Sequence, residues 1–164
     1  MMSMELCKNG CLVDVLIEKG PFEDETLLKH LMLQICNGLD AMHTTTKHAH
    51  LDLKPDNILI GDDYLLKLTD FGFAQPTEID LLKHIGTVGY EAPEIMNRMG
   101  LAPKTYKGVQ ADVFSLGVVF FVMKFGKPPF SRATQTDGNY KIFTKKAETF
   151  WRCHPTVRRC KSVD

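Results

Sequence analysis

The clearest pattern of hydrophobic and polar positions covers residues 25–43. Apolar residues recur there every three or four positions, which places them on one stripe of an α-helix. Asp24 stands directly before the segment and has the short polar side chain favoured at a helix N-cap. The pattern therefore predicts an amphipathic helix with one face against a core. The stripe consists of Leu27, Leu31, Ile35, Leu39 and Met42.

Three further segments have helical patterns. The most apolar one, residues 113–125, is too short to span a bilayer and is bounded by charged residues. We therefore expect a buried core helix over residues 112–125, ended by Gly126-Lys127-Pro128-Pro129-Phe130. A last helix is expected around residues 140–151. The remaining helix contains Leu12, Val13, Leu16 and Ile17 and stops at Gly20-Pro21.

Two short strands are expected between these helices. They are Ile58-Leu59-Ile60 and Leu65-Leu66-Lys67-Leu68, with Gly61-Asp62-Asp63 as the turn. The hairpin places Asn57 at its entrance and Asp70 just past its exit, so it would hold both side chains on one rigid element. Residues 72–103 are interrupted by Gly and Pro, which predicts mainly loop.

Composition narrows the class of protein. The 164 residues suit one domain, and a hydrophobic content of 44% suits a packed core. Lys plus Arg equals Asp plus Glu at 20 each, so no charge excess indicates nucleic acid or an anionic membrane. Five cysteines without a CxxC pair, and an N-terminus without signal-peptide features, lead us to expect a cytoplasmic protein with reduced thiols. A metal site at Cys153-His154 with Cys160 is an alternative, although the spacing is poor and a fourth ligand is not evident.

The chemically richest segment is His50-Leu51-Asp52-Leu53-Lys54-Pro55-Asp56-Asn57. Asp70-Phe71-Gly72 and Ala92-Pro93-Glu94 follow it in order. Together these motifs resemble the catalytic and metal-binding loops of eukaryotic protein kinases, and Lys-Pro resembles the serine/threonine type. The resemblance implies the C-terminal lobe of the kinase-like α+β fold, mainly α with a small β-hairpin and without the N-terminal lobe. It implies a partial kinase domain over residues 1–154, beginning at a hinge at Met4-Glu5-Leu6-Cys7, and a divergent tail over residues 155–164.

The resemblance also implies roles in phosphoryl transfer from ATP. Asp52 would be the catalytic base, and Lys54 would neutralise charge on the transferred group and contact the nucleotide. Asn57 and Asp70 would bind Mg²⁺ through hard oxygen atoms and thereby hold the nucleotide. His50, Phe71 and Gly72 would have structural roles in the two loops.

The nucleotide base would lie against the hinge. The backbone of Glu5 and Cys7 would hydrogen-bond to adenine, Met4 would be the gatekeeper, and Leu59 would form the floor of the pocket. Cys11 stands where the family often has an acidic residue for the ribose, which leaves that contact open.

The segment Gly86-Thr87-Val88-Gly89-Tyr90-Glu91-Ala92-Pro93-Glu94 resembles the substrate-docking loop of serine/threonine kinases. Gly86 and Thr87 would shape it, with Thr87 bonded to the catalytic loop. Asp112 would brace that loop from below, since a carboxylate accepts several N–H bonds. Glu94 normally pairs with an Arg further along, and neither Arg158 nor Arg159 can be assumed to replace it.

Two further features concern the regulation of the protein and the branch of the kinase family that it resembles. Leu51 replaces the Arg that often grips an activation-loop phosphate, and Thr77 is the main free phosphorylation site in that loop. We therefore hypothesise that activity does not depend on phosphorylation of this loop. The last expected helix, ending Phe150-Trp151, resembles a calcium/calmodulin-dependent-like branch.

Two functions follow from these expectations. In the first, the chain is the catalytic half of a serine/threonine kinase that uses ATP and Mg²⁺ on a protein Ser/Thr hydroxyl, with neither nucleic acid nor membrane as partner. The sequence has no Gly-rich phosphate loop and no strand lysine, so an N-terminal lobe of a full-length protein would have to supply them. The chain alone is therefore expected to have little activity. In the second, it is a non-catalytic kinase-like binding or scaffold module.

Overall fold

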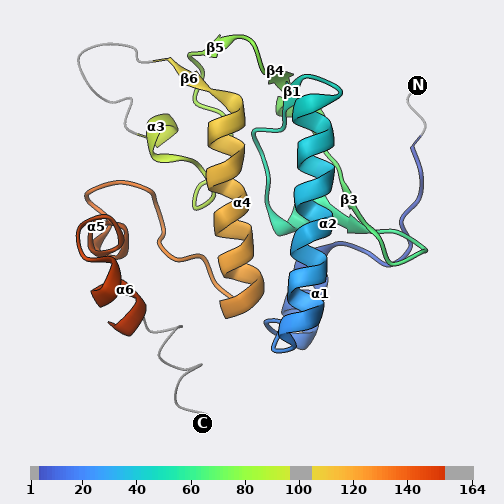
Figure 1. Cartoon of the computed structure of the whole chain (residues 1–164), viewed down its shortest axis with the longest axis horizontal. Coiled ribbons are helices and arrows are strands. Elements are labelled where there is room, and N and C mark those ends of the chain that lie inside the picture. The colour runs from blue at the N-terminus through green and yellow to red at the C-terminus, as the bar shows by residue number, and fades with distance from the viewer. Residues whose placement is uncertain (1–3, 97–104, 154–164) are drawn as a thin grey trace.

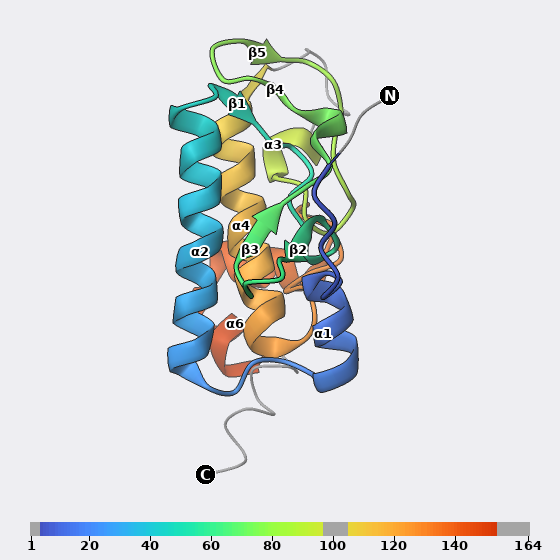
Figure 2. The same cartoon turned by 90° about the vertical axis from the view of Figure 1, so that its right-hand side faces the viewer.

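Two long helices form the centre of the molecule. The computed structural model describes residues 4–96 and 105–153. Helices α2 (Glu25–Thr44) and α4 (Gly108–Phe125) lie side by side and run in opposite directions (Figures 1 and 2). The Asp24 side chain accepts hydrogen bonds from the backbone N–H groups of Thr26 and Leu27, at 2.8 and 3.0 Å. The expected helix and its N-cap are confirmed.

The buried face of α2 differs from the expected stripe at its first residue. Leu28 is buried, whereas Leu27 is nearly half exposed. Both positions lie near the same stripe of a 3.6-residue helix, and packing against neighbouring helices selects between them. The resulting core joins α1 (Leu12–Lys19), α2, α4 and the chain from the loop at Leu53 to Ile58. Its buried members are Leu12, Leu28, Ile35, Leu39, Leu53, Ile58, Val119 and Met123.

Helix α4 begins four residues earlier than expected. Its 18 residues have a mean hydropathy of 1.5, so by length and composition it could cross a membrane, which corrects our expectation for the shorter segment. Half of it is buried inside the protein, and core helices pass the same test, so the indication is weak. Gly126 ends the helix in the left-handed region, with φ 77°.

The described residues form three two-stranded antiparallel sheets, which lie beside the helices (Figures 1 and 2). Strands β2 (Ile58–Ile60) and β3 (Leu66–Leu68) form the expected hairpin, with Ile58 opposite Leu68. Two other pairs were not expected. They tie the segment predicted as loop to other parts of the chain: β1 (His48–Ala49) pairs with β4 (Gln75–Pro76), and β5 (Asp80–Leu81) pairs with β6 (Tyr106–Lys107).

The single helix expected near the C-terminus is two helices. They are α5 (Gly138–Lys145) and α6 (Ala147–Cys153), and the chain leaves helical geometry at Lys146, with φ −147° and ψ 66°. The bend lets the Phe150 ring pack on Phe121 of α4, with ring centroids 6.1 Å apart. The proposed tail over residues 155–164, with Arg158, Arg159 and Cys160, lies outside the described residues, as does His154 directly before it.

Candidate active site

A buried carboxylate on α4 organises the loop that follows β1. Asp112 is fully buried and accepts hydrogen bonds from the backbone N–H groups of His50 and Leu51, both at 2.7 Å. His43, in the last turn of α2, lies 2.7 Å from the same carboxylate through Nε2. The structure therefore brings Asp112 to the place that the resemblance implies. Sequence reasoning missed His43, since nothing in a helix-terminal histidine indicates a partner 69 residues away.

This bracing coincides with backbone strain. Leu51 has φ 66°, in the left-handed region that bulky side chains rarely adopt, and its side chain is buried. Such a conformation costs of order 1–3 kcal/mol and persists only where surrounding contacts impose it. The two N–H bonds to Asp112 and the burial of Leu53 in the core supply those contacts.

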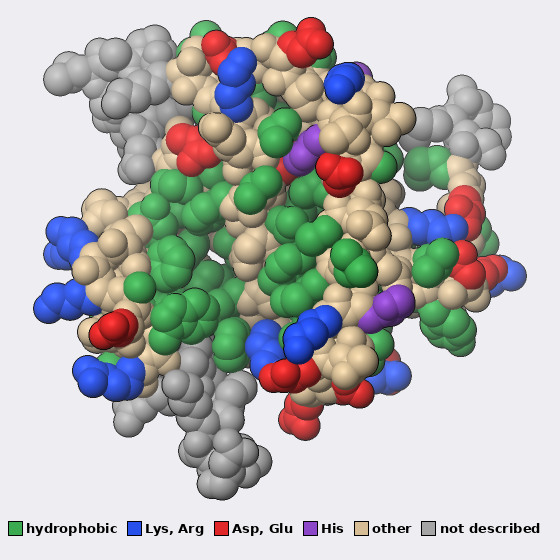
Figure 3. All heavy atoms as spheres, viewed as in Figure 1, with side chains coloured by type: hydrophobic (Ala, Val, Ile, Leu, Met, Phe, Trp, Pro, Cys, Tyr) green, Lys and Arg blue, Asp and Glu red, His purple; other side chains and the backbone are tan. Residues whose placement is uncertain are grey.

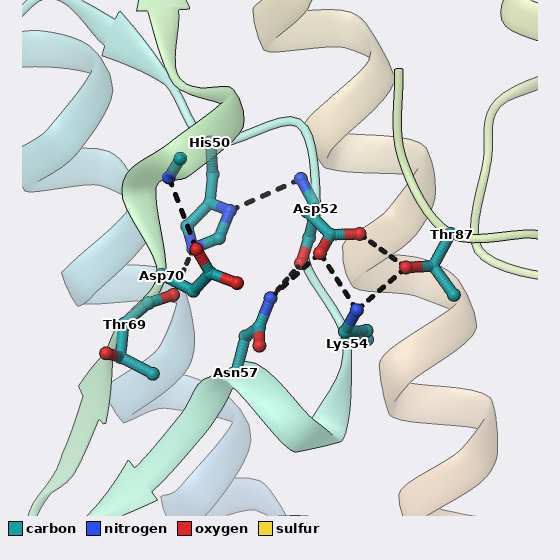
Figure 4. A network of polar contacts seen from close by, with 8 residues as sticks. His50, Asp52, Lys54, Asn57, Thr69, Asp70 and Thr87 are labelled. Carbon is teal, nitrogen blue, oxygen red and sulfur yellow. Dashed lines mark hydrogen bonds and ion pairs between the residues drawn. The ribbon is translucent and has the colours of Figure 1, made fainter. Parts of the chain in front are cut away.

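The Asp52 carboxylate is the centre of a polar network (Figure 4). It is only 5% exposed, and both of its oxygens are engaged. Oδ1 accepts a hydrogen bond from Thr87 Oγ1 at 2.6 Å. Oδ2 accepts from Lys54 Nζ at 2.9 Å and from Asn57 Nδ2 at 3.1 Å. Lys54 Nζ also donates to Thr87 Oγ1 at 2.8 Å, so the cation, the hydroxyl and the carboxylate fix one another.

Asn57 and Asp70 lie at the two ends of the β2–β3 hairpin. Asn57 closes a short 3₁₀ helix (Pro55–Asn57), and the N–H of Thr69 donates to its carbonyl oxygen at 3.1 Å. The Asn57 Nδ2 also bonds the Asp52 carbonyl at 2.9 Å, which leaves its amide oxygen as the atom for another partner. An amide oxygen and a carboxylate are the hard ligands that Mg²⁺ prefers, so these two residues fit the expected metal.

His50 connects the catalytic loop to the segment after β3. The Asp52 N–H donates to His50 Nδ1 at 3.3 Å, and His50 Nε2 lies 3.0 Å from the Thr69 carbonyl oxygen (Figure 4). This pattern fits a neutral imidazole that carries its proton on Nε2. The imidazole also packs on Phe71, with ring centroids 5.5 Å apart.

Asp70 has an unusual backbone conformation for a non-glycine residue. Its φ is 63° and its ψ is 71°, in the left-handed region, and its Oδ1 accepts from the Gly72 N–H at 3.3 Å. Asp and Asn tolerate this region better than most residues because their short side chains bond locally. Asp70, Phe71 and Gly72 thus form a compact turn beside the catalytic loop.

The docking loop approaches the catalytic loop at a glycine. Gly86 has φ 120°, and a Cβ there would lie 3.1 Å from the Leu51 carbonyl oxygen and 3.2 Å from Glu91 Cγ. A side chain at this position would therefore meet both strain and close contacts. The close approach brings the next residue, Thr87, onto Asp52 and Lys54.

Sequence reasoning missed the burial of Glu91 and the partial burial of Tyr90 in the same segment. Glu91 is buried and lies 2.7 Å from His84 Nε2. Burial raises the pKa of the Tyr90 phenol to about 12, with a smaller contribution from the negative charge of Asp56. Glu94 lies in the first turn of the short helix α3 (Pro93–Met96) and is half-buried.

The expected hinge residues lie along one side of the hairpin. Glu5 is exposed, and its Oε1 is 2.6 Å from Lys67 Nζ of β3. Cys11, four residues after the expected hinge, forms a β-bridge with Leu59, which brings it to the expected floor of the pocket. Met4 is largely exposed, and Cys7 is partly exposed.

A carboxylate lies beside Cys11, although the residue at position 11 is not itself acidic. Asp14, in the first turn of α1, accepts hydrogen bonds from Cys11 N at 3.0 Å and Cys11 Sγ at 2.9 Å. These bonds lower the pKa of Asp14, and burial together with the bond to Asp14 raises the pKa of the Cys11 thiol. The spacing of three residues is that of a capping box, which is the signal that could have found this pair.

The described residues contain no cluster of three or more His, Cys, Asp or Glu side chains that could hold a metal ion. Cys153 is exposed at the end of α6, and the other two members of the alternative metal site lie beyond the described part.

The fold and the site together define a class of protein. A mainly helical fold that joins a buried carboxylate, a lysine and two oxygen ligands on one hairpin is typical of enzymes that transfer phosphoryl groups. The family described as "Protein kinase domain" matches residues 1–162, and the chain belongs to this family.

Individual relatives agree with the family. The chain is 36% identical over 170 residues to CBL-interacting serine/threonine-protein kinase 10 of Arabidopsis thaliana, covering 98% of this chain and 33% of the relative. It is 33% identical to serine/threonine-protein kinase chk1 of Schizosaccharomyces pombe, covering 88% and 28%. It is 28% identical to serine/threonine-protein kinase KSP1 of Saccharomyces cerevisiae, covering 94% and 15%. The chain is therefore similar to serine/threonine protein kinases and spans about a third of the first of them or less.

Proposed function

We propose that this chain is the catalytic half of a serine/threonine protein kinase, which transfers the γ-phosphoryl group of ATP to a Ser or Thr hydroxyl of a protein. The observation that carries the proposal is the buried Asp52 carboxylate, held on both oxygens by Lys54, Asn57 and Thr87. Two separate segments converge on one carboxylate, which is what positioning of a reacting hydroxyl requires.

The residues divide the work as follows. Asp52 accepts a hydrogen bond from the substrate hydroxyl in place of Thr87, aligns its oxygen and takes its proton as the new bond to phosphorus forms. The bond between the γ-phosphorus and the bridging oxygen of ATP breaks in the same transfer, and ADP leaves. Lys54, already beside Asp52, neutralises charge on the transferred group. When bound, Mg²⁺ would neutralise charge on the phosphate oxygens, and Asn57 and Asp70 are the residues that would hold it.

The nucleotide base would lie between the hinge and the hairpin. The backbone of Glu5 and Cys7 would bond adenine, and Leu59 would form the floor. Asp14 supplies a carboxylate beside the expected ribose position, through its bonds to Cys11. Lys54 and the residues proposed to hold Mg²⁺ are the described groups that would face the phosphates.

The proposal is tested by replacing Asp52 with Asn in the longest natural polypeptide that contains this chain. We expect transfer from ATP to a serine peptide to fall about 10²- to 10⁴-fold, since general-base assistance is typically of that size. Asp56→Asn is the matched control, because Asp56 is an exposed carboxylate of the same loop and should leave the rate within about twofold.

A wild-type rate that does not depend on Asp52 would contradict the proposal. The alternative, a non-catalytic binding module, predicts peptide binding without any transfer. The calmodulin-dependent-like branch remains a proposal of its own, tested by whether calcium and calmodulin change the rate.

A further inference from the structure

One buried carboxylate of the docking loop is only partly satisfied. The Glu91 side chain is 3% exposed, and its Oε1 lies 2.7 Å from His84 Nε2. Its Oε2 is buried and has no hydrogen-bond partner; in the described part of the chain, no other buried side-chain polar atom lacks one. No Lys or Arg of that part forms an ion pair with Glu91. A buried carboxylate oxygen that lacks a hydrogen-bond donor lowers the stability of the folded state. Binding of a further donor at Oε2 would therefore be favourable.

The location of Glu91 indicates which molecule could supply the donor. Its Cγ lies 3.2 Å from the place of a Cβ on Gly86, so the two residues are in contact. The neighbouring Thr87 hydroxyl lies 2.6 Å from Asp52 Oδ1, where the substrate hydroxyl is proposed to bind. Glu91 thus contacts the residue directly before the threonine whose hydroxyl bonds Asp52.

The partner that Glu91 already has is open to replacement. The His84 side chain is 55% exposed, so solvent and ligands reach the imidazole that bonds Oε1. An arginine guanidinium has parallel N–H donors that match both oxygens of a carboxylate, and it could bond Oε1 and Oε2 together. A lysine ammonium could satisfy Oε2 alone.

We propose that Glu91 selects protein substrates that carry a basic side chain, preferably arginine, directly beside the phosphoacceptor residue. This inference rests on the proposed kinase function and assigns a specificity-determining residue to it. His84 holds the carboxylate in the absence of substrate and is displaced when the basic side chain enters. The stability of the free protein is reduced by the unsatisfied oxygen, and substrate binding removes that cost.

The inference is tested with serine peptides that differ only in the two residues flanking the serine. Arginine, lysine or norleucine is placed before the serine in one series and after it in another. Peptide affinity for the 164-residue chain is measured by fluorescence anisotropy, and transfer from ATP with Mg²⁺ is measured with the longest natural polypeptide. The test variant is Glu91→Gln, which removes the charge of the carboxylate. The control variant is Asp80→Asn, which removes an exposed charge in β5 that is paired with Lys107 in β6.

In one of the two series we expect the arginine peptide to bind about tenfold or more tightly than the norleucine peptide, with lysine between them. Glu91→Gln should reduce that ratio to about twofold or less, and Asp80→Asn should leave it unchanged. The thermal unfolding midpoint of Glu91→Gln should not fall, whereas a purely structural His84–Glu91 pair predicts a clear fall together with unchanged peptide ratios.

The outcomes separate this inference from the proposed function. Transfer with equal rates for all flanking residues overturns the inference and leaves the kinase proposal standing. A Glu91-dependent preference in binding, without transfer to any peptide, supports the inference and overturns the kinase proposal. Equal or unmeasurable affinity for all peptides overturns the inference.

Discussion

At the scale of single residues, Asp112 connects the core to the catalytic loop. Its two oxygens accept three hydrogen bonds, and two of these come from the backbone N–H groups of His50 and of the strained Leu51. In Asp112→Asn one acceptor becomes an NH₂ group that faces an N–H donor. We expect the free energy of unfolding to fall by about 1–3 kcal/mol, the cost of a buried unsatisfied polar group. Urea unfolding measures it, and the exposed Asp80→Asn should change it by less than about 0.5 kcal/mol.

Tyr90 gives the protein a sensitivity to alkaline pH. Its pKa is about 12 when folded and lies near the ordinary value of 10 when unfolded, because burial disfavours the phenolate. The folded state therefore holds this proton more tightly. The associated stability is complete below pH 10 and is lost as the pH rises through 12.

Tyr90→Phe removes this titration and should flatten the corresponding part of the pH dependence of stability. Chemical denaturation at intervals from pH 8 to pH 11.5 measures it for both proteins. Tyr140, whose pKa is also raised by burial, still titrates in the variant and serves as an internal reference. Parallel curves for the two proteins would show that Tyr90 is not the group responsible.

At the scale of elements, the sequence predicted best where the pattern is local. The α2 helix, its Asp24 cap and the β2–β3 hairpin depend on residues close together in the chain, and all were found. The β1–β4 and β5–β6 pairs were missed because two-residue strands have no alternation to detect and their partners lie more than 20 residues away. The α5–α6 break was missed because aromatic packing on α4 decides it.

The same distinction holds for the site. The catalytic loop and Asp70 are contiguous motifs and could be named from the sequence. His43 and Glu91 matter through contacts that only the fold creates, and a histidine or a carboxylate alone carries no such signal. Asp14 differs, because its bonds to Cys11 are local and have the spacing of a capping box. Glu91 in particular is indistinguishable in the sequence from a solvated loop residue.

The segment between β3 and α3 packs through apolar side chains on Leu51, the residue that stands where many kinases have an arginine. Leu51 is buried in a cluster with Leu81 and Ile85 of that segment. Thr77 is anchored separately, through its N–H bond to the Lys47 carbonyl oxygen at 2.9 Å. Burial of two or three aliphatic side chains contributes several kcal/mol, enough to order the segment without a phosphate.

Thr77→Ala in the longest natural polypeptide should therefore leave turnover within about twofold of wild type, since surface changes of this kind seldom matter. Leu51→Ala is the positive control, because it removes the apolar contact of Leu51 with the segment. It should lower activity, and it should lower the free energy of unfolding by about 2–5 kcal/mol. Turnover with a serine peptide and thermal unfolding measure the two effects. A large loss in Thr77→Ala would mean that phosphorylation at this residue is required.

At the scale of the whole molecule, apolar side chains remain on the surface. Figure 3 shows them on the face between α4 and the α5–α6 pair, where a groove of about 280 Å³ is lined by residues such as Val113, Phe143 and Trp151. A larger cavity of about 570 Å³ lies between the end of α2 and β3, and Phe71, about half exposed, lines it. The catalytic turn at Asp70 therefore borders an open apolar space, and nothing described here covers that side of the site.

In the proposed function, few of the described residues would hold the phosphates of ATP. The described groups proposed to face its phosphates are Lys54 and the two metal ligands, and the sequence has neither the Gly-rich loop nor the strand lysine that positions phosphates in this family. Poor positioning alone can cost about 10²-fold in rate. We expect the 164-residue chain to transfer phosphate at least that much more slowly than the same chain fused behind a kinase N-terminal lobe. Asp52→Asn in both proteins separates true catalysis from background, and an isolated chain with equal, Asp52-dependent turnover would show that its own residues suffice to hold the nucleotide.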